Sequence, residues 1–385
     1  MVEPPPGVGR PRAGQEDLDS ERDGMQSRRS APHRRGPRDG ALEVRAGRPD
    51  DDAARDAFVA AQPEGGFAQR AGWLRAGERV FGHRRRDLVA WRDGRIVGVL
   101  PLARCERLLG PAHLISVPYG VCAGPLGEDE LVVRVLVAAA VELARVERVG
   151  RLELRCDADP GLDDLATSDL YVAFARDLPA AGEDILTGLP KEERRLVRRA
   201  RDRHGLELVE GAEHITDLER LFHDSKRRLG SPSLPLAWFQ TLHEELGGAA
   251  VVHATRRVGI TVAASLSFVH GDTISMYYVG TTPEANRAWA ATSFMIAGLA
   301  EWARERGLSR FDLGRSRRDS GALAFKRNQG FEARPLAYRY HLVRSRTTPS
   351  FTPSNPRTRI LREVWARLPR AVTHGLSPAA ARYLP

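Results

Sequence analysis

Apolar and polar positions change their spacing several times along the chain, and each change predicts a different element. Two apolar runs in residues 87–102 flank Arg92-Asp93-Gly94-Arg95, which predicts a β-hairpin because Asp-Gly favours a tight turn. Residues 131–146 carry aliphatic side chains at helical spacing and predict a helix. Around these, the pattern predicts strands at 42–44, 113–120 and 152–154, and helices at 50–60 and near 72–74.

The second half of the chain repeats this order. The predicted elements are a basic helix at 191–203, a strand at 206–208, helices at 215–228 and 236–246, strands at 249–255, 259–269 and 273–279, a long helix at 288–306, a strand through Phe311 and Leu313, and a last strand at 336–343. A helix-led antiparallel meander, a long helix, a strand, a helix and a strand is the element order of the GNAT acyltransferase fold. Its repetition predicts an α+β chain with two tandem GNAT-like domains.

Composition sets the predicted boundaries. Residues 1–40 are rich in proline, glycine, arginine and acids and have almost no aliphatic periodicity, so we expect disorder there. We expect an N-terminal GNAT-like domain at 41–180 and a C-terminal one at 181–345. Residues 346–385 are expected to be a basic tail with an amphipathic helix.

The formal net charge of +9 is concentrated near the end of the chain. Residues 344–385 contain eight arginines and one acid, Glu363. The predicted tail helix places aliphatic side chains among arginines, so it is expected either to pack on its own domain or to contact an anionic membrane from the inner face. Arg195 and Arg199 lie four apart on the basic helix, as expected for a clamp on a phosphorylated glycan or lipid-linked precursor. A solvated basic face is the alternative for each of these segments.

The three cysteines lack metal or disulfide spacing, and the sequence predicts no metal site and no tightly bound cofactor. No apolar run reaches the roughly 18 residues of a membrane span, and the first thirty residues lack the apolar core of a signal peptide. We therefore expect a cytoplasmic protein. The oligomeric state stays open.

Lysine is rare in this chain. Only Lys191, Lys226 and Lys326 occur among 59 Lys plus Arg residues. A compact ammonium and a planar guanidinium are not interchangeable, so Lys326, in a loop region with Asp312 and Arg315, is a candidate for stabilising an oxyanion. Asp312, Tyr278 or a water relay is the candidate base. Chance survival of Lys326, a capping role for Asp312 and core packing of Tyr278 remain the alternatives.

The start of the predicted long helix is the candidate donor site. Backbone N–H groups at a helix N-terminus suit a pyrophosphate. Thr281, Thr282 and the N–H groups near Ala288 are expected to face it, although the Arg/Gln-x-x-Gly-x-Gly/Ala loop of ordinary acetyltransferases is absent.

Several short stretches, taken in order, resemble a known family. They are Val97-Gly98-Val99-Leu100-Pro101-Leu102, Ser116-Val117-Pro118-Tyr119, Leu229-Gly230-Ser231-Pro232, Tyr277-Tyr278-Val279-Gly280, Phe311-Asp312-Leu313-Gly314-Arg315-Ser316 and Phe325-Lys326-Arg327-Asn328-Gln329-Gly330-Phe331. The set is similar to FemAB-related proteins with a BioF2-like acetyltransferase domain. More narrowly, it is similar to those associated with exosortase/PEP-CTERM and exopolysaccharide loci.

This resemblance implies transfer of an acyl or aminoacyl group to an amine, from acyl-CoA or aminoacyl-tRNA. It puts Phe325 and Lys326 on the family's Phe-Lys pair and Asp312 and Gly314 on its Asp-x-Gly strand end. Arg315, Phe325 and Tyr119 are the candidate substrate contacts. Many peptidoglycan enzymes of the family have a glycine where Arg315 stands. Three functions stay open: an acyltransferase acting on a cell-envelope or exopolysaccharide precursor, a tRNA-dependent peptidoglycan bridge enzyme, and a catalytically idle adaptor that binds phosphoglycan or membrane.

Overall fold

The hairpin predicted from Asp93-Gly94 organises the first half of the chain. In the computed structural model, which describes residues 40–318, 320–348 and 356–385, both residues have positive φ, 52° and 76°, as a tight hairpin turn requires. The hairpin belongs to a sheet ordered β1-β3-β4-β7, with β1 at Glu43–Ala46, β3 at Leu88–Arg92, β4 at Arg95–Leu100 and β7 at Leu126–Gly127. The predicted disorder of residues 1–40 falls almost entirely outside the described residues.

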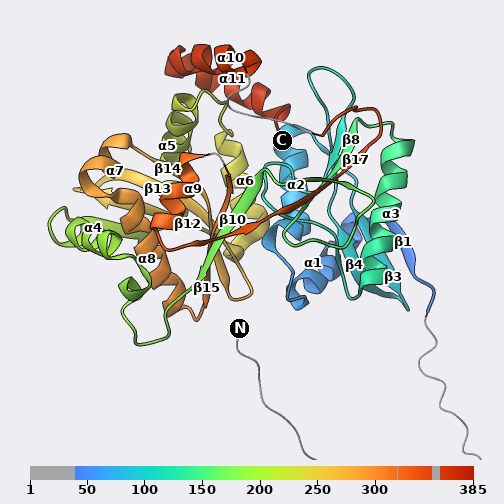
Figure 1. Cartoon of the computed structure of the whole chain (residues 1–385), viewed down its shortest axis with the longest axis horizontal. Helices are drawn as coiled ribbons and strands as arrows, with labels where there is room; N and C mark the ends of the chain where they lie inside the picture. Colours follow the sequence, from blue (N-terminus) through green and yellow to red (C-terminus); the bar gives the residue numbers. More distant parts are fainter. Residues whose placement is uncertain (1–39, 319, 349–355) are drawn as a thin grey trace, which may run out of the picture. The chain divides into compact units, whose positions relative to one another are not determined.

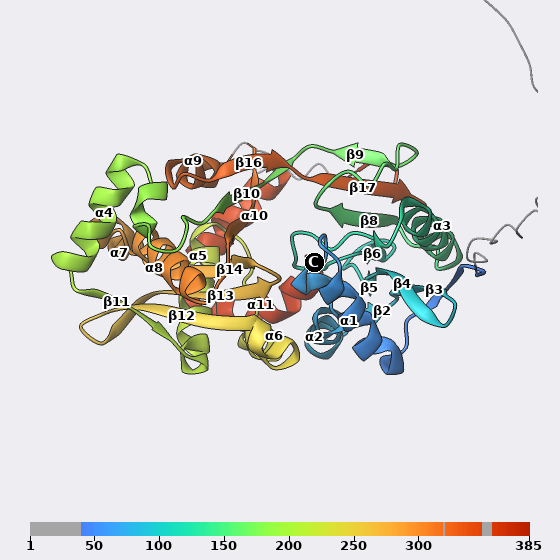
Figure 2. The same ribbon diagram turned by 90° about the horizontal axis from the view of Figure 1, so that it is seen from below.

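A second sheet of the first half has the order β2-β5-β6-β8-β17-β9 (Figure 2). Its strands are β2 (Arg84–Arg85), β5 (Ala103–Cys105), β6 (His113–Ile115), β8 (Arg151–Cys156), β17 (Ala337–Leu342) and β9 (Ala166–Ser168). Three helices accompany these strands: α1 (Asp52–Ala61), α2 (Ala71–Phe81) and α3 (Glu130–Val146). The Asp129 side chain caps α3 by accepting the N–H of Val132, and Leu136 and Ala140 of α3 pack in one core with Leu152 and Leu154 of β8.

The second half is built on a sheet ordered β11-β12-β13-β14-β15-β10-β16. Figure 1 labels its strands β12 to β15 and β10. Its strands are β11 (Leu206–Glu210), β12 (Ala250–Arg257), β13 (Ile260–His270), β14 (Thr273–Thr281), β15 (Arg310–Arg317), β10 (Tyr171–Asp177) and β16 (Glu332–Pro335). Side chains of α4 (Lys191–Asp202) and α8 (Ala291–Glu305) share one core with Ile274 and Met276. Side chains of α5 (Ile215–Arg228) and α6 (Leu236–Leu246) share another core with Tyr278. Helices therefore cover both faces.

Two strands cross the boundary that the sequence predicted near residue 180. Strand β10 precedes that boundary but pairs with β15 and β16 of the later sheet. Strand β17 was expected in the later sheet, yet it pairs with β8 and β9, beside which Figure 2 draws it. Each half therefore donates one strand to the other, and residues 41–385 form one compact unit.

The predicted long helix is broken. Instead of one helix from Ala288 to Arg306, the chain forms α7 (Pro283–Trp289) and α8, separated by Ala290 with φ of 53°. The prediction of a single helix starting at Ala288 was wrong, because an alanine-rich pattern carries no mark of the one alanine that adopts a left-handed conformation. Ala288 lies in the last turn of α7.

The tail forms two helices, α10 (Pro356–Arg367) and α11 (Arg370–Arg382), which confirms the predicted helical C-terminus. Helix α11 contacts both halves of the unit. The Ser377 hydroxyl accepts the N–H of Ser233, and the Tyr119 hydroxyl donates to the carbonyl of Ala381. Among the described residues, no helix is long and apolar enough to cross a bilayer.

Candidate active site

The central feature of the sheet of the second half is the divergence of β14 and β15. These parallel strands pair only at Thr273–Ser275 with Arg310–Asp312 and then separate. On β14, Met276 and Tyr278 face consecutive residues of β13, so Tyr277 is an extra residue in a bulge. On β15, the pairing with β10 shifts around Gly314, whose φ is 63°. A bulge on one strand and a left-handed glycine on the other open the sheet at this point.

Lys326, on α9 (Gly321–Asn328), holds the bent part of β15. Its ammonium donates to the carbonyls of Leu313, Gly314 and Arg315, at 2.6, 3.0 and 3.0 Å. The turn at Gly314 brings these consecutive carbonyls to one point, where a single nitrogen with three N–H groups can satisfy them. All donors of the charged lysine are therefore used by the protein.

The electrostatic setting of Lys326 is unusual. Burial lowers the pKa of Lys326 to about 8, the charge of Asp312 opposes this shift, and Arg315 adds to it. The ammonium also lies 5.3 Å from the centre of the Phe174 ring. Lys326 thus titrates near the physiological range.

Asp312 lies on β15 at the last paired position. One carboxylate oxygen accepts the N–H of Gly314 at 2.6 Å, and the other accepts the Ser275 hydroxyl at 3.4 Å. Burial raises the pKa of Asp312, and the Gly314 N–H partly offsets this rise. A carboxylate with a raised pKa is a stronger base, so Asp312 remains a candidate proton acceptor.

Arg315 follows the bend and joins the two halves. Its guanidinium donates to the Tyr338 hydroxyl at 2.8 Å and lies 4.6 Å from the centre of the Tyr171 ring. Tyr338 in turn donates to the carbonyl of Val121, and the N–H of Val121 donates to the Tyr277 hydroxyl. The bulged tyrosine of β14 and the arginine of β15 are therefore linked through one residue of the first half.

Lys226 is a residue that the sequence did not assign to the site. It lies on α5 beside the end of β14, where Ser225 donates to the carbonyl of Thr281 and Gly280 packs against the backbone of Phe222. Its ammonium lies 5.0 Å from the centre of the Phe222 ring and has no hydrogen bond or ion pair with any described residue. Burial lowers the pKa of Lys226, and the like charge of Arg315 lowers it further. The rarity of lysine in this chain was the only sequence signal that pointed to Lys226.

Two predicted site residues have structural partners instead. Tyr278 is buried, its hydroxyl accepts the indole N–H of Trp238 at 3.0 Å, and it donates to the carbonyl of Tyr119. Burial raises the pKa of Tyr278 well above that of free tyrosine, so its hydroxyl stays protonated and is poorly suited to accept a proton. The Tyr119 hydroxyl contacts His83 at 2.8 Å as well as Ala381. Both rings belong to the interface between the halves.

The predicted donor residues surround the break between α7 and α8. Thr282 caps α7 by accepting the N–H of Ala285, and the Thr281 hydroxyl makes long contacts of 3.4 to 3.5 Å with described residues. Asn286 accepts both the N–H and the hydroxyl of Thr292, at 3.1 and 2.8 Å. The Asn286 side chain therefore occupies part of the N-terminus of α8, and Ala288 belongs to the last turn of α7.

The remaining predicted contact residues lie on α4 and α9. Arg195 pairs with Glu192 on the surface of α4, and Arg199 lies one turn further along the same helix. Within the described residues, no hydrogen bond or ion pair joins either arginine to Asp312, Arg315 or Lys326. Phe325 is 39% exposed on α9.

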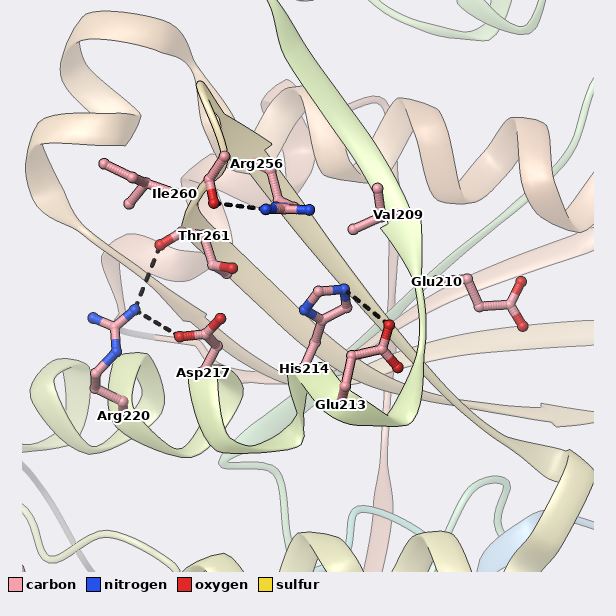
Figure 3. Close-up of a pocket in the computed structure, with 10 residues that line it drawn as sticks. Val209, Glu210, Glu213, His214, Asp217, Arg220, Arg256, Ile260 and Thr261 are labelled. Atoms are coloured by element: carbon pink, nitrogen blue, oxygen red, sulfur yellow. Dashed lines mark hydrogen bonds and ion pairs between the residues drawn. The ribbon is translucent and has the colours of Figure 1, made fainter.

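A polar hollow shown in Figure 3 lies elsewhere, between the start of α5 and strands β11 to β13. Its charged side chains satisfy one another or the backbone. Arg220 pairs with Asp217 at 3.0 Å, Arg256 donates to the carbonyl of Gly259, and His214 faces Glu213. This pairing leaves little free charge for a ligand, so the divergence of β14 and β15 is the better candidate site.

Comparison with known proteins identifies the surrounding domain. Residues 190–327 match the family model of the GNAT acetyltransferase domain. The second half contains a GNAT domain. The matched range includes β14, the broken helix, Asp312 and Lys326, so the divergent strands lie within it. No curated protein matches the chain by sequence.

Solved structures extend this likeness over both halves. FemX is similar with a TM-score of 0.61 and 15% identity, over 78% of this chain and 98% of FemX. A tandem GNAT protein from the clavulanic acid biosynthesis pathway is similar with a TM-score of 0.51 and 16% identity, over 81% of this chain and all of the other. At this identity the likeness concerns the fold, and it confirms the predicted pair of GNAT-like units.

Proposed function

We propose that the chain is an N-acyltransferase of the FemAB/GNAT type. The observation that carries this proposal is the opening between β14 and β15, where Asp312, Arg315 and Lys326 converge within a GNAT domain. We propose a cell-envelope or exopolysaccharide precursor as acceptor, in keeping with the resemblance to proteins of exosortase/PEP-CTERM loci. A cytoplasmic setting, where such precursors and their activated donors are made, belongs to the same proposal.

The proposed reaction needs few groups. An acceptor amine attacks the carbonyl of a thioester or ester, a tetrahedral oxyanion forms, the amine loses a proton, and the thiol or hydroxyl leaves with one. Asp312 accepts the amine proton. The N–H of Tyr277, the residue left over in the bulge, and the charge of Arg315 stabilise the oxyanion.

In this scheme Lys326 is a positioning residue. Its N–H groups all bind carbonyls of β15, and it thereby fixes the bend that separates Asp312 from Arg315. The role differs from the direct oxyanion contact expected from the sequence.

Lys226 extends the proposal to the substrate. Its ammonium has no hydrogen bond or ion pair with any described residue, and it lies beside the end of β14, where the like charge of Arg315 lowers its pKa. An anionic substrate group, such as the phosphate of a phosphorylated glycan or lipid-linked precursor, would supply the missing counter-charge. The predicted clamp of Arg195 and Arg199 remains a separate proposal for the same kind of group.

Two donors remain in the proposal. Acyl-CoA is the usual donor of the GNAT fold, and Thr281 and Thr282 would lie near it. One observation favours aminoacyl-tRNA, as in a peptidoglycan bridge enzyme: Asn286 already caps the Thr292 N–H at the start of α8. Transfer from labelled acyl-CoA and from a charged-tRNA mixture, each with and without ribonuclease, distinguishes the two donors. Ribonuclease-resistant transfer contradicts the tRNA donor.

The third function is a catalytically idle adaptor that binds a phosphoglycan or an anionic membrane. It predicts that Lys326→Ala binds ligand normally and that no donor labels any acceptor. Our proposal predicts labelling by wild type, and a raised KM with little change in kcat for Lys226→Ala. Failure of every donor with a broad extract of envelope precursors favours the adaptor.

A further inference from the structure

Helix α10 attaches to the protein by its more polar side and exposes an aliphatic side to solvent, the reverse of the usual surface helix. It attaches to the end of α5 by one side: Arg362 donates to the carbonyl of Leu229, and Arg227 donates to the carbonyl of Ala366. Gly230, with φ of 70°, lies so close that a Cβ there would meet the carbonyl oxygen of Arg362 at 2.4 Å. Arg362 and Ala366 are four residues apart and so mark the side that faces the protein.

The opposite side of α10 is aliphatic and turned to solvent. Ile360, Leu361 and Val364 are 65%, 69% and 51% exposed. At spacings of one and four residues they lie within roughly 100° of one another on the helix. A surface helix normally buries this face and shows its polar face to water. The next helix, α11, also exposes an aliphatic pair four residues apart, Val372 and Leu376.

Exposed arginines accompany the aliphatic side chains: Arg367 is seven residues from Ile360 and so lies on nearly the same side, and Arg359 lies about 100° round the helix from Ile360. Arg367 is exposed and forms no hydrogen bond or ion pair with any described residue, and Arg359 has only an exposed contact of 3.5 Å with Glu363. The tail as a whole carries eight arginines and one acid. Exposed aliphatic side chains on a helix with exposed arginines complement a bilayer surface, which has an apolar interior and anionic headgroups.

We propose that α10 lies in the headgroup region of an anionic lipid bilayer, with Ile360, Leu361 and Val364 inserted and Arg359 and Arg367 on the lipid phosphates. This inference is independent of the catalytic proposal. It fits an interfacial helix rather than a spanning one, because the aliphatic stripe occupies one face of a twelve-residue helix.

Co-sedimentation with vesicles tests the proposal. The full chain is mixed with vesicles of phosphatidylglycerol and phosphatidylcholine, and separately with phosphatidylcholine alone. We expect binding only to the anionic vesicles, with a loss of roughly tenfold or more for Ile360→Ser/Leu361→Ser/Val364→Ser. The matched control, Leu108→Ser/Leu109→Ser, removes two side chains that are 74% and 79% exposed in the first half and should bind normally.

A second variant keeps the test valid if the triple variant folds poorly. Arg359→Gln/Arg367→Gln changes only exposed charges, and we expect about fivefold weaker binding per arginine, with the difference vanishing at high salt. Equal binding of wild type and both variants overturns the proposal, as does no binding of wild type to anionic vesicles. A wild-type dimer that the triple variant abolishes, seen by light scattering without lipid binding, assigns the face to a second copy and also overturns it.

Discussion

At the scale of single residues, Lys326 is explained by the geometry of its nitrogen. Three carbonyls of β15 converge on one ammonium, and only lysine provides three N–H groups from one atom at the end of a flexible chain. A guanidinium at this position would spread its donors over a plane. The same fact explains why lysine is kept at this position in a chain rich in arginine.

Replacing Lys326 should therefore affect both stability and activity. We expect Lys326→Ala to lower the free energy of unfolding by about 1–3 kcal/mol, because buried carbonyls lose their donor. Lys326→Arg should restore the charge but not the activity. Denaturant unfolding and the transfer assay measure the two effects, with exposed Lys191→Ala as control. A stable and fully active Lys326→Arg would show that charge alone suffices.

The pKa of Lys326 gives a second prediction. Folding lowers the pKa of Lys326 to about 8 from 10.5, so between these pH values the unfolded chain binds more protons than the folded one. The charged lysine therefore costs stability below pH 8, and this cost disappears as the pH rises toward 10.5. The free energy of unfolding of wild type, relative to Lys326→Met, should rise over that range. Parallel curves would contradict the assigned pKa.

At the scale of elements, the break between α7 and α8 depends on one side chain. The N–H of Thr292 lies in the first turn of α8, where the helix itself supplies no acceptor, and the Asn286 side chain accepts it as an N-cap side chain does. We expect Asn286→Ala to lower the free energy of unfolding by about 1 kcal/mol. Asn286→Asp keeps an acceptor and should cost less. Equal losses for both variants, measured by denaturant unfolding, would mean that the cap contributes nothing.

The sequence predicted most elements because their periodicity is local. The hairpin at Asp93-Gly94, the helix at 131–146 and the three-stranded meander of the second half all follow from spacing and turn residues. It could not predict the break at Ala290, which depends on one dihedral angle. It did not predict β10, and it could not assign β17 to its sheet, because an alternating strand has the same pattern in either sheet.

The candidate site was only partly predictable for a related reason. Composition pointed to Lys326, and the order of elements brought it near Asp312 and Arg315. The partners that decide each role come from distant parts of the chain: Tyr278 meets Trp238, and Arg315 meets Tyr338. Lys226 becomes a candidate only once the structure shows that its ammonium has no hydrogen bond or ion pair with a described residue.

At the scale of the molecule, the exchange of β10 and β17 makes the halves dependent on each other. A fragment of residues 41–180 would carry β10 without its sheet and lack β17, and a fragment of residues 181–345 would lack β10 between β15 and β16. We expect neither fragment to fold alone, and the full chain to unfold in one transition. Circular dichroism of the separate fragments checks this, and a cooperative melt of fragment 181–345 by itself would contradict it.

The central claim is that acyl transfer takes place where β14 and β15 diverge. Two arginines on β15 provide the most direct test, since Arg315 lies in the opening and Arg310 lies at the paired end, next to Asp177. In the transfer assay, Arg315→Ala should reduce kcat/KM by about a hundredfold, the order expected for losing one stabilising group, while Arg310→Ala should behave as wild type. Full activity in Arg315→Ala, or equal losses in both variants, would contradict the account.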